Sequence, residues 1–389
     1  MSDIKSKRNV KIEIIRLIAC FAVIWYHIRE LPFKTNGELS ETAVFFECLC
    51  TICVMTFFLI TGFFIYNKKG NIITDWISLL KKFLINIFVP FIIVCVITLI
   101  FHDFLISKNS FIECINNINI SYIIEKLFLS IKSFDVAMLP GTAAHLWYVY
   151  SYAIIMLVYP ITRYILTKMP KFVGYLIVAI LTVFMVVNDY HLYFGDPSYN
   201  LIFKIIHKPI YYSAVGHILY NDIIKKYVDS KPIDDKTLII NIKLFVISIL
   251  VYAINFVLLF FTQVGYYLGV NNGYVYTSWL SLYSLIMTSA FILVVYNVNA
   301  EKFLTSKIKN AIFYLSGKTL YIYLVHYLII TKFMSIGFQN IWTRNRPNII
   351  YHFIYYIFYS LFIFILSLIV VIVLDFIKRG LICLKEKII

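Results

Sequence analysis

An arginine and a histidine, Arg16 and His27, stand at the two ends of the apolar stretch RLIACFAVIWYH, with ten residues between them. In an α-helix this separation corresponds to about three turns, so both side chains are expected on one face, about 16 Å apart along the axis. An arginine in a membrane-spanning segment usually faces a cavity or a partner, because its burial costs a few kcal/mol. Glu13, three residues earlier, is the predicted partner of Arg16. The pattern predicts a polar track along this helix.

Two further histidines and a glutamate are predicted to share the depth of His27 in the membrane. His326 lies about fifteen residues into a late apolar segment, His145 at the outer start of another, and Glu47 near the outer end of a third. Histidine titrates near neutral pH and is therefore suited to proton transfer. A three-histidine zinc site is the alternative chemistry, but no close HxxxH-type spacing favours it. We expect a proton-transfer site near the outer face and no bound metal.

These residues belong to a chain whose composition is typical of a membrane protein. Of its 389 residues, 61% are hydrophobic and only 14% are charged, whereas a soluble chain carries about a quarter charged residues. Apolar runs of about 20 residues, the length of a membrane-spanning helix, recur along the whole sequence. The sequence therefore predicts an all-α polytopic bundle of about ten transmembrane helices, near residues 11–29, 43–66, 83–101, 145–166, 172–189, 202–220, 238–262, 276–298, 311–333 and 350–376.

The distribution of lysine and arginine predicts the orientation of these segments. Basic residues collect on the cytoplasmic loops of membrane proteins. With the N-terminus in the cytoplasm, 23 basic residues fall on the inner side and ten on the outer side. Both termini are therefore expected in the cytoplasm. The same asymmetry accounts for the net charge of +15 without a nucleic-acid partner.

Five segments, taken in chain order, resemble the membrane-bound acyltransferase-3 family. The first is the arginine–histidine pair at Arg16 and His27, with Glu13 at the acidic position of the family's D-x-x-R start. The others are TFFLITGFFIY at Thr56–Tyr66, HLWYVYSYAIIMLVYP at His145–Pro160, YYSAVGHILY around Gly216, and LSGKTLYIYLVH at Leu315–His326. The chain departs from the family in KKFLINIFVP, where Lys81 and Lys82 are present but Asn86 replaces an expected arginine. Lysine attracts phosphate as a point charge, without the bidentate geometry of arginine.

The resemblance implies a single acyltransferase-3-like transmembrane domain over residues 1–389, without an appended soluble domain. It implies an O-acyltransferase that moves an acyl group, typically acetyl, from cytosolic acyl-CoA to a hydroxyl of a cell-surface or lipid-linked glycan. Acyl-CoA is then a donor substrate, and no cofactor is expected to stay bound. The expected location is the plasma membrane of a bacterium, which the chain crosses several times. The oligomeric state is left open.

The resemblance and the predicted positions also assign roles to single residues. His27 is the expected general base, and Arg16 either binds the donor or organises His27 through Glu13. The expected substrate-binding set comprises Glu13, Glu47, Lys82, His145, Trp147, Tyr148, Ser316, Tyr323 and His326. Trp147 and Tyr148 either line the acceptor path or belong to the aromatic belt at the membrane interface. Ser316 and Tyr323 either contact substrate or form hydrogen bonds between helices.

Two other functions are compatible with a polytopic bundle that has a polar interior. The first is a transporter or flippase for a polysaccharide or a lipid-linked sugar. The second is the membrane module of a vancomycin-resistance serine racemase, which would carry a fused racemase domain after the membrane part. The sequence reaches Ile389 about a dozen residues after the last predicted span, so we expect no such fused domain. A serine-nucleophile hydrolase is not favoured, because no G-x-S-x-G motif occurs.

Overall fold

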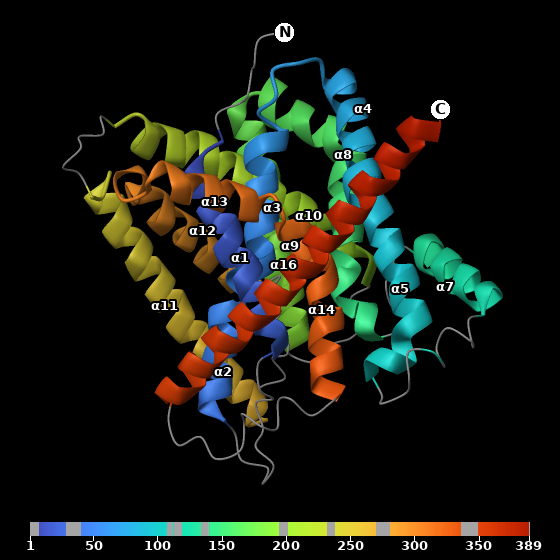
Figure 1. Cartoon of the computed structure of the whole chain (residues 1–389). Coiled ribbons are helices and arrows are strands. Elements are labelled where there is room, and N and C mark those ends of the chain that lie inside the picture. The colour runs from blue at the N-terminus through green and yellow to red at the C-terminus, as the bar shows by residue number, and fades with distance from the viewer. Residues whose placement is uncertain are drawn as a thin grey trace. The chain divides into compact units, whose positions relative to one another are not determined.

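The computed structural model describes residues 8–28, 40–106, 112, 119–133, 139, 141–193, 201–231, 238–269, 281–335 and 349–388 (Figure 1). Within these ranges the chain is helical apart from turns and caps, and it forms no strand. A single isolated β-bridge joins Ile239 to Val298. The prediction of an all-α fold is therefore confirmed for the described residues.

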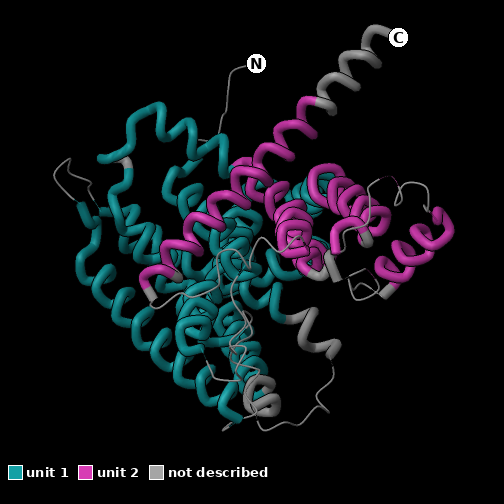
Figure 2. The backbone as a smooth tube through the Cα atoms, turned by 60° about the horizontal axis from the view of Figure 1, so that its bottom comes forward, with its two compact units in different colours: residues 1–83, 151–316 teal, residues 84–150, 317–389 magenta. Residues whose placement is uncertain are grey.

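The chain divides into two compact units (Figure 2). Unit 1 comprises residues 1–83 and 151–316, and unit 2 comprises residues 84–150 and 317–389. Each unit thus combines an N-terminal and a C-terminal part of the sequence. The prediction of a single domain over residues 1–389 stays a prediction.

Unit 1 is centred on a buried helix, α3, which packs against α1, α10 and α12. Other helix pairs in contact within this unit include α11 with α12 and α1 with α13. The helices are α1 (Val10–Ile28), α2 (Glu41–Cys50), α3 (Ile52–Ile65), α4 (Ile72–Phe83), α8 (Trp147–Lys168, from its second turn), α9 (Lys171–Tyr193), α10 (Leu201–Ile218), the π-helix η3 (Leu219–Asp229), α11 (Ile242–Tyr267), α12 (Leu282–Asn297), the 3₁₀-helix η4 (Ala300–Lys302) and α13 (Ser306–Ser316).

Glycines bring α3 and α10 unusually close together. A Cβ atom added at Gly62 would lie 1.8 Å from the carbonyl oxygen of Ser213, and one added at Gly216 would lie 2.2 Å from the carbonyl oxygen of Leu59. Small residues allow this kind of backbone approach between apolar helices. The hydroxyl groups of Tyr66 and Ser213 lie 3.0 Å apart and form a hydrogen bond beside this contact. The two glycines therefore set the spacing at the centre of unit 1.

Unit 2 is organised around α14, which packs against α5, α16 and the 3₁₀-helix η2. The amphipathic helix α7 packs on α5, and the hydroxyl groups of Ser130 and Tyr150 form a hydrogen bond at 2.9 Å. The elements are the π-helix η1 (Leu84–Phe88), α5 (Val89–Ile106), α7 (Ile120–Ser133), η2 (Gly141–Leu146), α14 (Thr319–Ser335) and α16 (Ile349–Ile388).

Five helical stretches in the described part of the chain are long and apolar enough to cross a membrane. They are Glu41–Ile65, Ile72–His102, Trp147–Lys168, Ile242–Tyr267 and Phe353–Phe376, and three shorter apolar helices cover Lys171–Val187, Leu282–Asn297 and Thr319–Ser335. These helices identify the chain as a membrane protein. The count of ten spans and the cytoplasmic location of both termini stay predictions.

The structure corrects the predicted span at 311–333. Two helices occupy this segment, because α13 ends at Ser316 and α14 begins at Thr319. Gly317 and Lys318 form the turn between them, and glycine commonly follows a helix end. Lys318 is fixed at this turn by an ion pair with Asp375 of α16. A long apolar run conceals such a break, since its hydropathy is continuous across it.

Candidate functional site

A cluster of charged side chains surrounds Glu13 in the first turn of α1. The Glu13 carboxylate accepts hydrogen bonds from Arg8 Nε at 3.1 Å and from Arg16 Nη1 at 3.1 Å. Arg8 Nη2 also donates to Ser316 Oγ at 2.9 Å, so the end of α13 joins the cluster. The pairing of Glu13 with Arg16, predicted from their spacing of three residues, is present. Arg8 is an additional member that the sequence did not indicate.

The chemistry of this cluster is that of an anion-binding group. Two guanidinium groups share one carboxylate, so the cluster keeps a net positive charge. The Glu13 side chain is 5% exposed, whereas that of Arg16 is 29% exposed. Among the described residues, Glu13 alone accepts hydrogen bonds from Arg16, which otherwise lies 5.4 Å from the ring centre of Phe64. The remaining N–H groups of Arg16 can therefore donate to a phosphate or carboxylate in the bidentate manner typical of arginine.

His27 lies in the last turn of the same helix. The helix α1 runs without interruption from Val10 to Ile28, so His27 and Arg16 are held in the helical register that their spacing requires. His27 is partly buried, and its ring lies edge-on to that of Tyr26 at 5.5 Å between ring centres. Two residues earlier, Trp25 packs against Phe46 of α2, with ring centres 5.6 Å apart.

A second cluster, in unit 2, contains His145 and His326. Their rings are nearly perpendicular, with centres 5.2 Å apart. His145 Nε2 lies 3.2 Å from the carbonyl oxygen of Leu324, and His326 Nδ1 lies 2.7 Å from that of Tyr323. Because a carbonyl oxygen only accepts, these two ring nitrogens carry the protons. In the neutral rings, His145 Nδ1 and His326 Nε2 are then the basic nitrogens.

Aromatic residues enclose this histidine pair. Tyr323 donates a hydrogen bond from its hydroxyl group to the carbonyl oxygen of His145. The ring of Tyr148 lies 5.6 Å from that of Tyr323 and 6.3 Å from that of Trp147. Both histidines are buried, with exposed fractions of 3% for His145 and 0% for His326. The predicted residues of unit 2 therefore form one compact group, and their roles toward substrate stay predictions.

The remaining predicted residues lie in unit 1 at other positions. Glu47 of α2 is buried and accepts hydrogen bonds from Tyr267 Oη at 2.9 Å and from Gln263 Nε2 at 3.4 Å, both on α11. Lys82 is exposed in the last turn of α4. The predicted meeting of His27 with His145 and His326 joins residues of different units and stays a prediction.

Sequence reasoning missed the role of Arg163, which it counted only as a cytoplasmic basic residue. The Arg163 side chain is 4% exposed, and its Nη1 donates at 2.7 Å to both Asp75 Oδ2 and the Tyr159 hydroxyl group. Its Nη2 donates to the carbonyl oxygens of Lys68 and Gly70. Arg163 thereby fixes the turn between α3 and α4. Tyr159 lies one helical turn before Arg163, but Lys68, Gly70 and Asp75 lie about 90 residues away in sequence, so no local pattern could have indicated these three partners.

Metal binding has no ready site in the described residues. No group of three or more histidine, cysteine, aspartate or glutamate side chains is placed there to hold a metal ion. The five cysteines that the structure describes, Cys20, Cys48, Cys50, Cys53 and Cys95, are buried thiols without disulfide bonds.

Comparison with known proteins identifies the family. A family model described as an acyltransferase domain, that of the acyltransferase-3 family, matches residues 9–375. The matched range covers most of both units and includes Glu13, Arg16, His27, His145 and His326. No curated protein and no solved structure matches the chain.

Proposed function

Because the chain belongs to the acyltransferase-3 family, we propose that it is an O-acyltransferase of the bacterial plasma membrane. The proposed donor is cytosolic acyl-CoA, most simply acetyl-CoA, and the proposed acceptor is a hydroxyl of a cell-surface or lipid-linked glycan. The observation that supports this proposal is the family match together with the arrangement of two residues on one uninterrupted helix, with Arg16 in the second turn of α1 and His27 in its last turn.

The donor end of the proposed path is the cluster around Glu13. Acyl-CoA carries several negative charges on its phosphate groups, and charge-assisted hydrogen bonds from arginine are the strongest that a protein side chain offers them. Arg16 keeps N–H groups available, and Arg8 adds a second positive charge at 3.0 Å from the same carboxylate. Glu13 thus holds both guanidinium groups in place while leaving their net charge positive. Lys82, exposed on α4, is a further proposed contact for the donor.

The proposed chemical step needs one base. His27 accepts the proton of the acceptor hydroxyl while the oxygen attacks the thioester carbonyl carbon. The new C–O bond forms, the C–S bond breaks, and the CoA thiolate leaves. The imidazolium of His27 then returns its proton to the thiolate, so that free CoA and the acyl ester are the products. The roles of Glu47 and of the aromatic and histidine group of unit 2 toward the acceptor stay predictions.

The test compares His27→Ala with His102→Ala in purified protein reconstituted in nanodiscs. His102 is a histidine of α5 outside the proposed site, so its replacement controls for the general loss of an imidazole. Removal of a general base typically lowers a rate by 10²–10⁴-fold. We expect CoA release from acetyl-CoA to fall by about this factor in His27→Ala and to persist in His102→Ala. Full turnover in His27→Ala would refute the role of His27, and absence of acetyl-CoA binding by the unmodified protein would refute the acyl-transfer proposal.

A further inference from the structure

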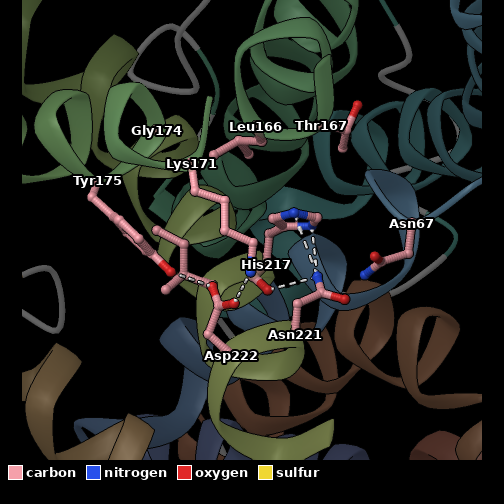
Figure 3. A pocket seen from close by; sticks show the side chains of 10 residues that line it. Asn67, Leu166, Thr167, Lys171, Gly174, Tyr175, His217, Asn221 and Asp222 are labelled. Atoms are coloured by element: carbon pink, nitrogen blue, oxygen red, sulfur yellow. Dashed lines mark hydrogen bonds and ion pairs between the residues drawn. The ribbon is translucent and has the colours of Figure 1, made fainter. Parts of the chain in front are cut away.

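A pocket in unit 1 lies apart from the residues used above (Figure 3). Its volume is about 380 Å³, within the range of about 300–1,000 Å³ typical of small-molecule sites. Four helix ends build it: Asn67 follows α3, Thr167 lies in the last turn of α8, Lys171 begins α9, and His217 and Asn221 lie where α10 passes into η3. The predicted orientation places all four of these ends at the cytoplasmic face.

The charges of the pocket cancel one another. Lys171 Nζ donates to Asp222 Oδ1 at 2.8 Å, and the Tyr175 hydroxyl group donates to Asp222 Oδ2 at 2.9 Å. Figure 3 shows this pair on the side of the pocket opposite Asn67. With its one lysine and its one aspartate joined, the lining offers a neutral surface of amide, hydroxyl and imidazole groups. Such a surface favours an uncharged ligand group with hydrogen-bonding edges.

The side chains around the cavity match the edge and the faces of a nucleobase. Asn67 Nδ2 donates to the carbonyl oxygen of Phe63 at 2.7 Å. This bond uses one amide hydrogen, and no other hydrogen bond joins Asn67 to the described part of the chain. Its Oδ1 and second N–H are therefore available together, and an asparagine amide pairs in this bidentate way with N6 and N7 of adenine. Tyr175 and His217 supply flat rings, on which bases stack.

The imidazole of His217 is held in a fixed position. The residue His217 is 8% exposed, and its ring meets the Tyr66 ring edge-on at 5.9 Å between centres. Asn221 Nδ2 lies 3.1 Å from His217 Nδ1 and donates to the His217 carbonyl oxygen at 2.9 Å. Asn221 Oδ1 accepts from Lys225 Nζ at 2.7 Å. The exposed Lys225 thus places a positive charge beside a neutral pocket, as a nucleotide with an anionic tail requires.

We propose that this pocket binds the adenosine moiety of a nucleotide, with the adenine edge on Asn67 and the phosphates toward Lys225. The adenosine of acyl-CoA is one source, and to that extent the inference rests on the proposed function. A free adenine nucleotide presents the same chemistry and is the other source. The pocket is therefore a recognition site for the non-reacting end of the donor or a site for a soluble nucleotide.

The first experiment measures binding of adenosine 3′,5′-bisphosphate to the full chain in nanodiscs by calorimetry. Asn67→Ala should weaken binding by about tenfold or more. Asn255→Ala is the matched control, since Asn255 Nδ2 makes the same type of bond, to the carbonyl oxygen of Val251 at 2.9 Å, on α11. Tyr175→Phe should retain most binding and Tyr175→Ala should lose it. No binding by the unmodified protein, or equal binding by the two asparagine variants, would overturn the proposal.

The second experiment distinguishes acyl-CoA from a free adenine nucleotide as the source of the adenosine. It also tests the adenosine pocket separately from the proposed acyl transfer. If the adenosine belongs to the donor, Asn67→Ala raises KM about tenfold for acetyl-CoA but not for acetyl-4′-phosphopantetheine, which lacks adenosine. If a free nucleotide is the ligand, both KM values stay unchanged while AMP binding weakens. If the unmodified protein turns over neither donor, the proposed acyl transfer fails. The effect of Asn67→Ala on the binding of adenosine 3′,5′-bisphosphate still decides whether the pocket binds adenosine. An equal rise in both KM values would contradict adenosine recognition.

Discussion

Replacement of Gly62 by alanine is expected to force α3 and α10 apart. The added Cβ would lie 1.8 Å from the carbonyl oxygen of Ser213, whereas ordinary contacts of this kind begin at 3.4 Å. The nearest atom is backbone, so no side chain can rotate away to make room. The helices must therefore separate locally by about 1.6 Å, the difference between these two distances. Overpacking of a close contact typically costs about 1–3 kcal/mol, and the clash with a backbone atom places Gly62→Ala at the upper end.

The second glycine of the contact supplies an internal check. A Cβ at Gly216 would lie 2.2 Å from the carbonyl oxygen of Leu59, so Gly216→Ala is expected to destabilise by a similar but smaller amount. A separation that relieves the clash at Gly62 also relieves most of the clash at Gly216. The double variant should therefore lose little more stability than Gly62→Ala alone, since neighbouring sites that share one displacement are not additive.

The assay is thermal unfolding of the purified protein in detergent, followed by intrinsic fluorescence. Gly174→Ala is the matched control for stability, because its Cβ would meet only Leu166 Cδ2, at the ordinary distance of 3.5 Å. Alanine in place of glycine inside a helix contributes about 0.5–1 kcal/mol, so this variant should melt at the same or a higher temperature. An unchanged melting temperature for Gly62→Ala, or full additivity in the double variant, would refute the argument.

Three further predictions concern ionic groups. Arg163→Met should destabilise the protein by about 3–5 kcal/mol, because it leaves Asp75 without its buried partner. Lys168→Met, at an exposed position in the last turn of the same helix, should be nearly neutral. Equal melting temperatures of the two variants would contradict this role of Arg163. Partial burial alone would raise the pKa of Asp222, but the hydrogen bonds from Lys171 and Tyr175 outweigh it and hold that pKa below its ordinary value of 3.8. The stability that Asp222 contributes is therefore present above pH 3.8 and is lost as the pH falls further. Asp222→Asn should flatten the acid unfolding curve in this pH range. Glu13→Gln should raise KM for acetyl-CoA by about tenfold, since a hydrogen bond to a charged group contributes about 1.5–3 kcal/mol and the neutral amide oxygen holds the two guanidinium groups less firmly than the carboxylate. An unchanged KM would show that the cluster does not position the donor.

Local spacing predicted the features that lie within one helix. Glu13 and Arg16 are three residues apart, a separation that puts two side chains on one helical face, and their ion pair is present. The continuity of α1 between Arg16 and His27 follows from the same apolar run. Arg8 and Ser316 complete the cluster from 308 residues apart in sequence, and no local pattern connects them. Short-range geometry is thus accessible from sequence, whereas the tertiary partners are not.

Hydropathy predicted the helical class of the fold but not its interruptions. The residues on either side of Gly317 are apolar enough to suggest one long helix. The structure shows a turn at Gly317 and Lys318 instead, where Lys318 pairs with Asp375 far along the chain. The roles of buried polar residues were also hidden. Arg163 looks like an ordinary basic residue of a cytoplasmic loop until its four acceptors are in place. A binding role for His217 is likewise indicated only by its position in the pocket that four helix ends form.

The most direct test of acyl transfer across the membrane uses sealed proteoliposomes with acetyl-CoA, labelled in its acetyl group, on the face that bears Arg8 and Arg16. A glycan acceptor is enclosed on the opposite side, and ester-bound label is measured after extraction. The account predicts that the label becomes ester-bound in the acceptor with the unmodified protein, and that it does not in His27→Ala. Movement of the glycan without acetyl-CoA, or ester formation that is independent of His27, would contradict it.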